Sequence, residues 1–327
     1  MAEATTLLPL LFGIAAVVAV LLYPNRRTRA TAAMVMGALV ILLSAAAVTT
    51  EITGQVFRTT GSPEPGRSQI SLPTATSQPV QPSPAKRHIF VIVMENRPYS
   101  DALGSPYLSS LARTFAVATN YHSVSEPSLP NYLAMTSGDT WNIHDDNYHQ
   151  LPPTGLGEQL TGAGITWKAY SEGFAGDCFT SPYPYALKHN PFAYYGGGCP
   201  ANIVPIAELA GDLRAYTPAL SWIMPGLCND GHDCSQSTAD AWVAQVVPAI
   251  LASPSWRQGG ILFITWDEAG TASDNHVAAL VIAPNTVAHQ SATYYNHYSL
   301  LATIEDQVGV ARLGQAVGAT AMTDLIR

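Results

Sequence analysis

Residues 88–96 read HIFVIVMEN, an unbroken apolar run that ends in a glutamate and an asparagine. A run of this kind, rich in β-branched side chains, is typical of a strand buried on both faces of a parallel sheet. Similar runs lie at residues 165–170, 219–224, 261–266 and 277–282. Apolar positions with helical spacing lie between them, at residues 106–115, 129–137, 203–214, 236–252 and 297–309. The alternation predicts an α/β fold with a central, mostly parallel sheet and helices on both faces.

The composition excludes several classes of protein. The chain has 327 residues, of which 47% are hydrophobic and 12% are charged. A disordered tail or a coiled coil would need far more charge. Residues 87–327 hold nine of the 15 basic and 20 of the 23 acidic side chains, a net charge of −11. Because such a surface repels a phosphate backbone, we do not expect nucleic acid as a partner.

Two nearly uncharged apolar segments occupy the N-terminal part, at residues 7–23 and 31–49. Each approaches the length of about 20 residues that a helix needs to cross a membrane. Three arginines lie between them, and the positive-inside tendency keeps such a turn in the cytoplasm. We therefore expect a transmembrane helical hairpin within residues 1–52, multi-pass anchoring in the cell membrane, and export of the chain that follows.

The second apolar segment also has features of a secretion signal. Arginines precede it and small residues surround Ala47, so cleavage near Ala47 and secretion are the alternative to anchoring. Residues 53–86 are rich in Pro, Ser and Thr, which predicts an extended linker. Residues 87–327 are then predicted to form the exported domain.

All four cysteines lie in the second half of the chain, and none forms a CxxC pair. In an exported domain they predict two disulfides. Nearest neighbours in sequence would pair Cys178 with Cys199 and Cys228 with Cys234, which is one of three possible connectivities. Four buried free thiols are the alternative.

Pairs of polar side chains directly follow two of the predicted strands. Glu95 and Asn96 come after the first strand, and Asp267 and Glu268 come after the strand at residues 261–266. The carboxyl ends of parallel strands meet at one edge of a sheet, where α/β proteins bind their ligands. Carboxylates gathered there repel one another unless a cation neutralises them, so the pattern favours a divalent metal ion. Each carboxylate capping the following helix is the alternative.

Ser128 lies at the start of a predicted helix, within the sequence PSLPNY at residues 127–132. A serine at this place is usually an ordinary N-cap. It is also at the positive end of the helix dipole, beside free amides that can hold a phosphate, so a nucleophile would fit there. The pattern alone leaves both readings open.

Three histidines lie in polar surroundings that suit proton transfer or phosphate binding. His189 is preceded by Lys188, and His232 lies in the loop NDGHD beside Asp233. His297 opens the last predicted helix.

Several motifs together resemble one known family. The stretches IFVIVMENRPYSDALG, SEPSLPNYLAMTSG, YALKHNPFAY, SWIMPGLCNDGHDCS and SPSWRQGGILFITWDEAG look like the phosphoesterase family of bacterial acid phosphatases and phospholipases C, within the alkaline phosphatase superfamily. The resemblance covers roughly residues 88–310 and is strongest to the short mycobacterial acid phosphatase type. It implies an alkaline-phosphatase-like fold.

The resemblance also implies roles for individual residues. Ser128 would be the nucleophile, while His189 and His232 would contact the phosphate or protonate the leaving group. One divalent metal ion of unknown identity would bind to Glu95, Asn96, Asp267 and Glu268. Lys188, Asp233, Asn131 and His297 are predicted to contact the substrate.

The expected function is an extracytoplasmic, metal-dependent acid phosphatase that works through a phosphoserine intermediate on a small-molecule or lipid phosphate ester. A phospholipase C-type phosphodiesterase is the first alternative, and a catalytically inactive envelope-binding protein is the second. A sulfatase is disfavoured because the chain has no C/S-x-P-x-R element. The sequence does not indicate the oligomeric state.

Overall fold

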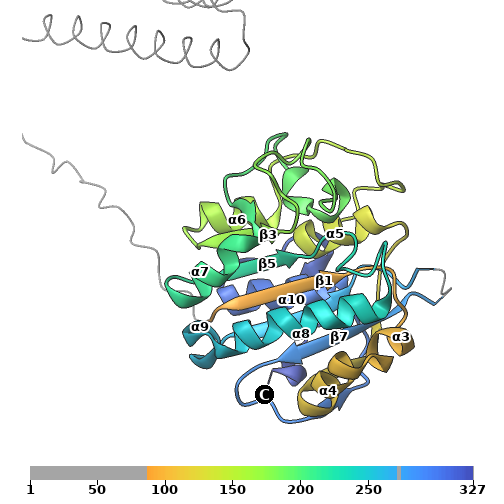
Figure 1. Ribbon diagram of the computed structural model, residues 1–327. Coiled ribbons are helices and arrows are strands. Elements are labelled where there is room, and N and C mark those ends of the chain that lie inside the picture. Colours follow the sequence, from red (N-terminus) through yellow and green to blue (C-terminus); the bar gives the residue numbers. More distant parts are fainter. Residues whose placement is uncertain (1–86, 271–273, 327) are drawn as a thin grey trace, which may run out of the picture. The chain divides into compact units, whose positions relative to one another are not determined.

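A nine-stranded sheet forms the centre of the computed structural model, which describes residues 87–270 and 274–326 (Figure 1). The strand order is β4-β3-β5-β1-β6-β7-β2-β8, and β9 also pairs with β2. The strands are β1 (Ile89–Met94), β2 (Ala116–His122), β3 (Trp167–Ser171), β4 (Ile203–Pro205), β5 (Leu220–Met224), β6 (Ile261–Trp266), β7 (His276–Ile282), β8 (His289–Ser291) and β9 (Tyr295–Asn296).

Strand β1, the apolar run that began the prediction, lies in the middle of the sheet. It pairs in parallel with β5 on one side and with β6 on the other. All six of its residues are buried, as expected for a strand covered on both faces. Strand β7 runs antiparallel to both β6 and β2. The predicted α/β fold with a mostly parallel sheet is therefore confirmed.

Helices cover both faces of this sheet. Figure 1 shows α8 in front of the sheet and α10 behind it. Helix α4 packs against α8, whereas α5 packs against α10. The α-helices are α3 (Tyr99–Gly104), α4 (Pro106–Thr114), α5 (Ser128–Ser137), α6 (Leu156–Gly162), α7 (Leu209–Arg214), α8 (Gln236–Ala252), α9 (Pro254–Arg257) and α10 (His297–Val308).

The helix predicted over residues 203–214 was only partly right. Its first residues form strand β4, where Ile203 pairs with Ala169 and Val204 with Tyr170 of β3. A 3-10 turn (Ile206–Glu208) and the short helix α7 then follow. Proline disfavours helical backbone in the residue before it, so Pro205 separates the strand from the helical part.

Strand β2 was not predicted, because its sequence AVATNYH has too few apolar residues to form a recognisable run. Its pairing with β7, β8 and β9 makes it a strand. In such a strand, pairing with neighbouring strands outweighs the local sequence pattern.

Both predicted disulfides are present, Cys178–Cys199 and Cys228–Cys234. The nearest-neighbour pairing is thereby confirmed, and the alternative of four free thiols was wrong.

The predicted membrane segments and the linker at residues 53–86 lie outside the described residues. Within residues 87–270 and 274–326, no helix combines the length and the apolar character needed to cross a membrane. The predicted hairpin of residues 1–52 therefore stays a prediction.

Candidate active site

The two polar pairs come together because β1 and β6 are neighbours in register. Met94 at the end of β1 pairs with Trp266 at the end of β6. The amide of Asp267 donates to the Met94 carbonyl at 3.0 Å, and the amide of Asn96 donates to Asp267 Oδ1 at 3.1 Å. Asn96 has a left-handed backbone (φ 50°), which asparagine adopts more readily than most residues. The chain thus turns sharply after β1 and brings Asn96 to Asp267.

Ser128 is the first residue of α5, and Pro127 occupies the N-cap position. The serine hydroxyl donates to Glu95 Oε2 at 3.1 Å and makes no capping hydrogen bond. Tyr132, one turn further along α5, donates to Glu95 Oε1 at 2.7 Å. The helix therefore directs two hydroxyl groups at one buried carboxylate, and the N-cap reading of Ser128 was wrong.

The carboxyl groups at this edge are held away from water. Burial raises the pKa of Glu95 well above its ordinary value, and the nearby Asp267 and Asp230 raise it further. Burial also raises the pKa of Asp267, and it raises that of Glu268 to about 8. Such shifts mark carboxylates that lack a compensating positive charge.

The donor set fits a divalent cation. Within the described residues, no three His, Cys, Asp or Glu side chains already stand in metal-ligand geometry. Three buried oxygens of the two polar pairs nevertheless lack a hydrogen-bond partner in that part of the chain: Asn96 Oδ1, Asp267 Oδ2 and Glu268 Oε2. Buried polar atoms rarely stay unpaired, and oxygen donors are what hard cations such as Mg²⁺ or Ca²⁺ prefer.

His189 lies between two buried carboxyl groups. Its Nε2 is 3.1 Å from Glu95 Oε1, and its Nδ1 is 3.2 Å from Asp230 Oδ2. The ring also stacks on Tyr132, with centroids 5.3 Å apart. Burial lowers the pKa of His189 to about 3 and raises that of Asp230 to about 7. His189 is thus a neutral ring at the heart of the acidic cluster.

Lys188 and His232 form the more open side of the site. His232 Nδ1 lies 2.7 Å from Asp233 Oδ1, while its Nε2 lies 3.3 Å from Lys188 Nζ. Lys188 donates to Asp146 Oδ2 at 3.0 Å. The side chains of Lys188, His232 and Asp233 remain 19%, 30% and 40% exposed, so an incoming anion can reach them.

Asp146 belongs to the site although sequence reasoning missed it. Its Oδ2 accepts from Lys188, and its Oδ1 accepts from the amide of Leu129, the residue after Ser128. It lies in an irregular loop that follows no predicted strand. The acidic pair Asp145-Asp146 was the signal available, but nothing in its spacing distinguishes a site residue from a solvated loop.

Asn131 and His297 are engaged by the protein itself. Asn131 Oδ1 accepts from the amides of Val124 and Ser125, and its Nδ2 donates to the Ser125 and Pro127 carbonyls. Asn131 thereby braces the loop that leads into Ser128.

His297 is fully buried beneath Asp267. Its Nε2 lies 2.6 Å from the Asp267 carbonyl oxygen, and its Nδ1 lies 3.0 Å from the Tyr121 hydroxyl. Burial lowers the pKa of His297 to about 4, so the ring is neutral. The predicted substrate contacts of Asn131 and His297 are not what this geometry shows.

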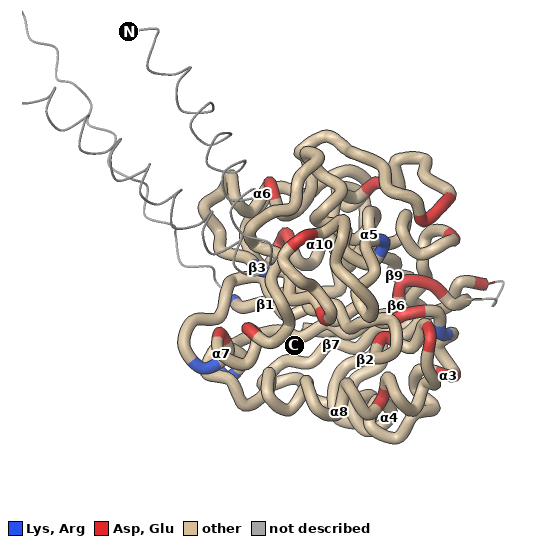
Figure 2. The backbone as a smooth tube through the Cα atoms, turned by 45° about the horizontal axis from the view of Figure 1, so that its top comes forward, with Lys and Arg blue, Asp and Glu red and all other residues tan. Residues whose placement is uncertain are grey.

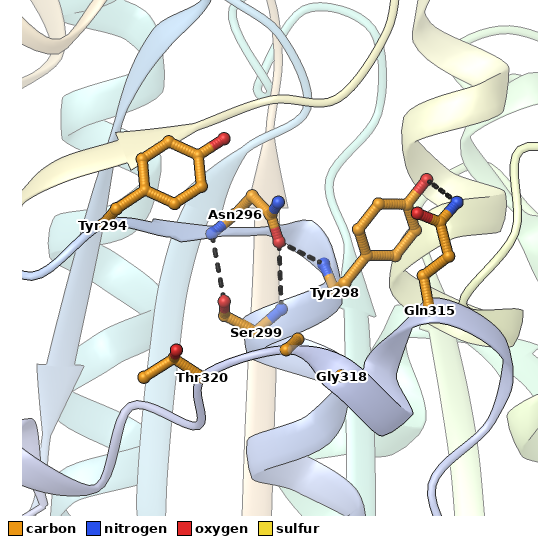
Figure 3. Close-up of a pocket in the computed structure, with 8 residues that line it drawn as sticks. Tyr294, Asn296, Tyr298, Ser299, Gln315, Gly318 and Thr320 are labelled. Carbon is orange, nitrogen blue, oxygen red and sulfur yellow. Dashed lines mark hydrogen bonds between the residues drawn. The ribbon is translucent and has the colours of Figure 1, made fainter.

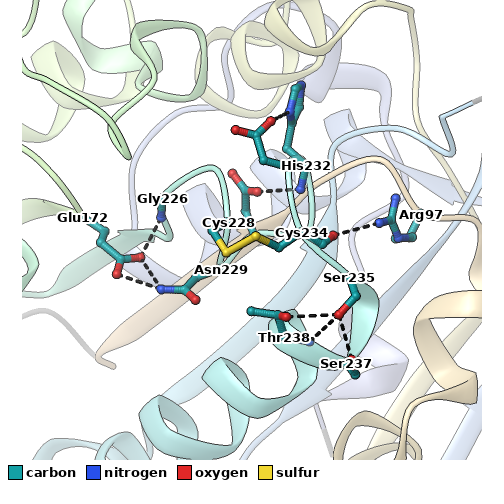
Figure 4. Close-up of a disulfide and its surroundings, with 12 residues drawn as sticks. Arg97, Glu172, Gly226, Cys228, Asn229, His232, Cys234, Ser235, Ser237 and Thr238 are labelled. Atoms are coloured by element: carbon teal, nitrogen blue, oxygen red, sulfur yellow. Dashed lines mark hydrogen bonds and ion pairs between the residues drawn. A yellow bond between two sulfur atoms is a disulfide. The ribbon is translucent and has the colours of Figure 1, made fainter.

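The loop that carries His232 is closed by the Cys228–Cys234 disulfide (Figure 4). Gly231 has a φ of +99°, which lets the loop turn between Asp230 and His232. Glu172 accepts from the Gly226 amide and from Asn229 on one side of the loop. Arg97 donates to the Cys234 carbonyl on the other side. His232 is therefore held by a short, braced loop.

Figure 2 shows acidic positions gathered beside the ends of β6 and β9. A separate pocket beside the start of α10 is lined by Tyr294, Asn296, Tyr298, Ser299 and Gln315, together with residues 318–320 (Figure 3). No acid, base or cation lines that pocket among the described residues, so the acidic edge is the candidate site.

A buried serine at a helix start, acidic oxygens without partners, and a lysine-histidine pair are the features of a phosphoric ester hydrolase. The phosphoesterase family model matches residues 104–311. The chain belongs to this family.

Two curated relatives support the assignment. A probable acid phosphatase from Kluyveromyces lactis is 29% identical over 264 residues, which cover 74% of this chain and 63% of the relative. A phosphatidylinositol-3-phosphatase from Mycobacterium tuberculosis is 29% identical over 256 residues, which cover 74% of this chain and 83% of the relative. The chain thus spans somewhat less than two thirds of the first relative and most of the second.

A solved structure confirms the fold. A protein of the alkaline phosphatase superfamily from Vibrio parahaemolyticus aligns with a TM-score of 0.53 and 13% identity, covering 73% of this chain and 72% of that one. The alkaline-phosphatase-like architecture expected from the motifs is therefore confirmed.

Proposed function

We propose that the chain is a metal-dependent phosphomonoesterase that works through a phosphoserine intermediate. The observation that carries the proposal is the Ser128 hydroxyl, which lies at the start of α5 and donates to the buried carboxylate of Glu95. The positive end of the α5 dipole favours a phosphate beside the hydroxyl.

Ser128 is the nucleophile of this proposal. Its Oγ forms a bond to phosphorus while the bond to the ester oxygen breaks in line with it. As the bond to phosphorus forms, the hydroxyl proton passes to Glu95 Oε2, to which the hydroxyl already donates, and it returns to Oγ when water splits the phosphoserine. The Lys188 ammonium attracts the phosphate oxygens, because phosphate binding in proteins relies on such cations.

His232 provides the proton for the leaving group. Asp233 holds its Nδ1–H, so that Nε2 is the atom that gives a proton to the ester oxygen and later takes one from the attacking water. That water splits the phosphoserine, releases inorganic phosphate and restores Ser128. His189, Asn131 and His297 position Glu95, the loop before Ser128 and Asp267, respectively.

Glu95, Asn96, Asp267 and Glu268 would hold the metal ion. When bound, the ion neutralises their charge and stabilises the charge that develops on the phosphate oxygens. The three unpartnered oxygens among these residues support this assignment.

We further propose that residues 87–327 act outside the cytoplasm. Four cysteines that are all paired in disulfides are typical of oxidising compartments. Anchoring by residues 1–52, with secretion after cleavage near Ala47 as the alternative, agrees with that location.

The test compares hydrolysis of p-nitrophenyl phosphate and bis-p-nitrophenyl phosphate by the full chain in detergent, before and after chelation. We expect monoester turnover that Ser128→Ala abolishes and that a divalent cation restores after chelation. Ser110→Ala, which replaces an exposed serine of α4, is the control and should keep full activity. A preference for the diester would favour the phospholipase C-type alternative, and no turnover of either ester by folded, metal-supplied protein would contradict the proposal.

A further inference from the structure

Two loops beside the site carry exposed aromatic side chains. Tyr148, Phe179 and Tyr183 are 40%, 44% and 62% exposed, and they are among the few large hydrophobic side chains that face water in the described part of the chain. Tyr148 lies on the loop that provides Asp146, and Phe179 and Tyr183 lie on the loop that leads to Lys188. Exposed aromatic groups near a binding site commonly contact a ligand.

The loop that carries Tyr148 is connected to the neighbour of the nucleophile by short contacts. Asp146 accepts from the amide of Leu129, the neighbour of Ser128, and from Lys188 on its other oxygen. Tyr148 follows Asp146 by two residues, so their Cα atoms are at most about 7 Å apart. The organic group of an ester whose phosphate lies between Ser128 and Lys188 therefore has these rings within reach.

Tyr148 and Phe179 are held in place by contacts with their neighbours. Tyr148 meets Phe179 edge to face with centroids 5.1 Å apart, and it packs on the buried Tyr194 at 5.3 Å. The Cys178–Cys199 disulfide fixes the residue before Phe179, and the Phe179 amide donates to Asp177 Oδ1 at 2.7 Å. Rings that are already ordered bind a ligand without a large cost in side-chain entropy.

We propose that Tyr148 and Phe179 form a platform for the organic group of the substrate, and that the preferred substrates are phosphate monoesters with an apolar ring or a short acyl chain. The proposal rests on the phosphomonoesterase function proposed above. An apolar group on these rings is removed from water, whereas the phosphate stays with Ser128 and Lys188. Esters of small polar alcohols lack this contact.

The experiment compares phenyl phosphate with 2-naphthyl phosphate, whose leaving phenols are similarly acidic. In the full chain we expect a higher kcat/KM for the naphthyl ester. Phe179→Ala should lower the ratio of the two kcat/KM values by about fivefold to tenfold, and Phe179→Trp should restore it. Tyr216→Ala is the matched control, because Tyr216 is 66% exposed but lies before the amino end of β5, whereas the site lies at the carboxyl ends of the strands.

Binding provides a readout that does not need turnover. The Ser128→Ala variant should bind 2-naphthyl phosphate, followed by the fluorescence of the naphthyl group, and addition of Phe179→Ala should weaken binding by a similar factor. An unchanged ratio and unchanged binding in the Phe179 variants would overturn the platform while leaving the phosphatase intact. Loss of all turnover in the wild type would instead reject the proposed function.

A second substrate pair identifies the source of the apolar group. Dihexanoyl phosphatidic acid, used below its micellar concentration, is compared with glycerol 3-phosphate. If Phe179→Ala removes a preference for the lipid, the result supports the platform and shows that it binds acyl chains. A loss confined to the naphthyl ester supports the platform and assigns it to rings.

Discussion

Asp146 illustrates how single residues decide the electrostatics of the site. One carboxylate fixes both Lys188 and the start of α5 through hydrogen bonds of 3.0 Å. Although burial opposes the charge on Lys188, Glu95 and Asp146 raise its pKa above the ordinary value. The lysine therefore stays positive and is held ready for an anion.

His232 should matter most for esters with a poor leaving group. In His232→Ala, we expect kcat for an alkyl phosphate to fall by about 10²–10⁴, because an alkoxide needs a proton as it leaves. For p-nitrophenyl phosphate, the rate of ester cleavage should fall much less, since nitrophenolate leaves without a proton. The measurement is a series of esters with graded leaving-group acidity. Equal losses of kcat/KM across the series would show that His232 is not the acid, because kcat/KM reports ester cleavage and not the later attack of water.

Glu305 should make the stability of the fold depend on pH. It is fully buried in α10, its Oε2 has no partner among the described residues, and burial raises its pKa to about 8. Because the pKa is higher in the folded state than in the unfolded state, the protonated carboxyl group favours folding. This contribution is fully present below the unfolded pKa of about 4.3. This contribution is lost as the pH rises toward 8, at up to about 1.4 kcal/mol per pH unit.

The Glu305→Gln variant isolates that contribution. The measurement is the free energy of unfolding from urea titrations between pH 5 and pH 8. It should fall less in the variant than in the wild type, by a few kcal/mol, because one pKa unit corresponds to about 1.4 kcal/mol. Glu208→Gln is the control, because the Glu208 side chain is 47% exposed and bonds to Lys168. Parallel pH profiles of wild type and Glu305→Gln would contradict the prediction.

Helices and strands set the positions of the site residues, and α10 is the clearest case. Asn296 caps it by accepting from the amides of Tyr298 and Ser299, while Ser299 Oγ accepts from the Asn296 amide (Figure 3). This reciprocal pair sets the position of His297, the first residue of the helix, beneath Asp267. The start of one helix is thereby linked to the acidic edge.

Loss of the cap should weaken both the helix and the site. Asn296→Ala should lower the free energy of unfolding by about 1 kcal/mol, whereas Asn296→Asp should keep most of it, since both Asn and Asp cap helices well. If α10 positions Asp267 through His297, kcat should fall in Asn296→Ala at temperatures where the protein is still folded. Unchanged stability in Asn296→Ala would contradict the role of the cap.

The Cys228–Cys234 loop should contribute more to activity than to stability. Closing a loop this short stabilises a fold by only about 2 kcal/mol. The loop nevertheless carries Asp230, His232 and Asp233. In Cys228→Ser/Cys234→Ser, we expect kcat to fall by about tenfold or more for alkyl esters, with a modest decrease in Tm. Wild-type kcat in a folded double variant would show that the other braces, Glu172 and Arg97, suffice.

At the scale of the whole molecule, the acidic edge is a source of instability that a cation should relieve. A hard divalent cation at about 100 times its Kd stabilises the folded state by about 2.7 kcal/mol, or about 5–10 °C in Tm for a domain of this size. Differential scanning fluorimetry of chelated protein with added Mg²⁺, Ca²⁺ or Mn²⁺ measures the shift. Asp267→Asn should reduce it, and an equal shift in that variant would place the cation elsewhere.

The sequence by itself determined the strands that are continuous apolar runs and the polar residues that directly follow them. β1, β5, β6 and β7 were predicted because a strand covered on both faces needs continuous apolar residues. Glu95, Asn96, Asp267 and Glu268 were predicted as a group because strand ends meet at a sheet edge.

Only the tertiary structure decided the remainder, since it depends on contacts between distant parts of the chain. Strand β2 forms because neighbouring strands pair with it, and β4 forms where the sequence pattern predicted a helix. Asp146 joins the site through Lys188 and Leu129, and His297 lies beneath Asp267 rather than facing outward. Local sequence does not encode these neighbours, because loop paths and the docking of helices on the sheet are set by packing across the whole domain.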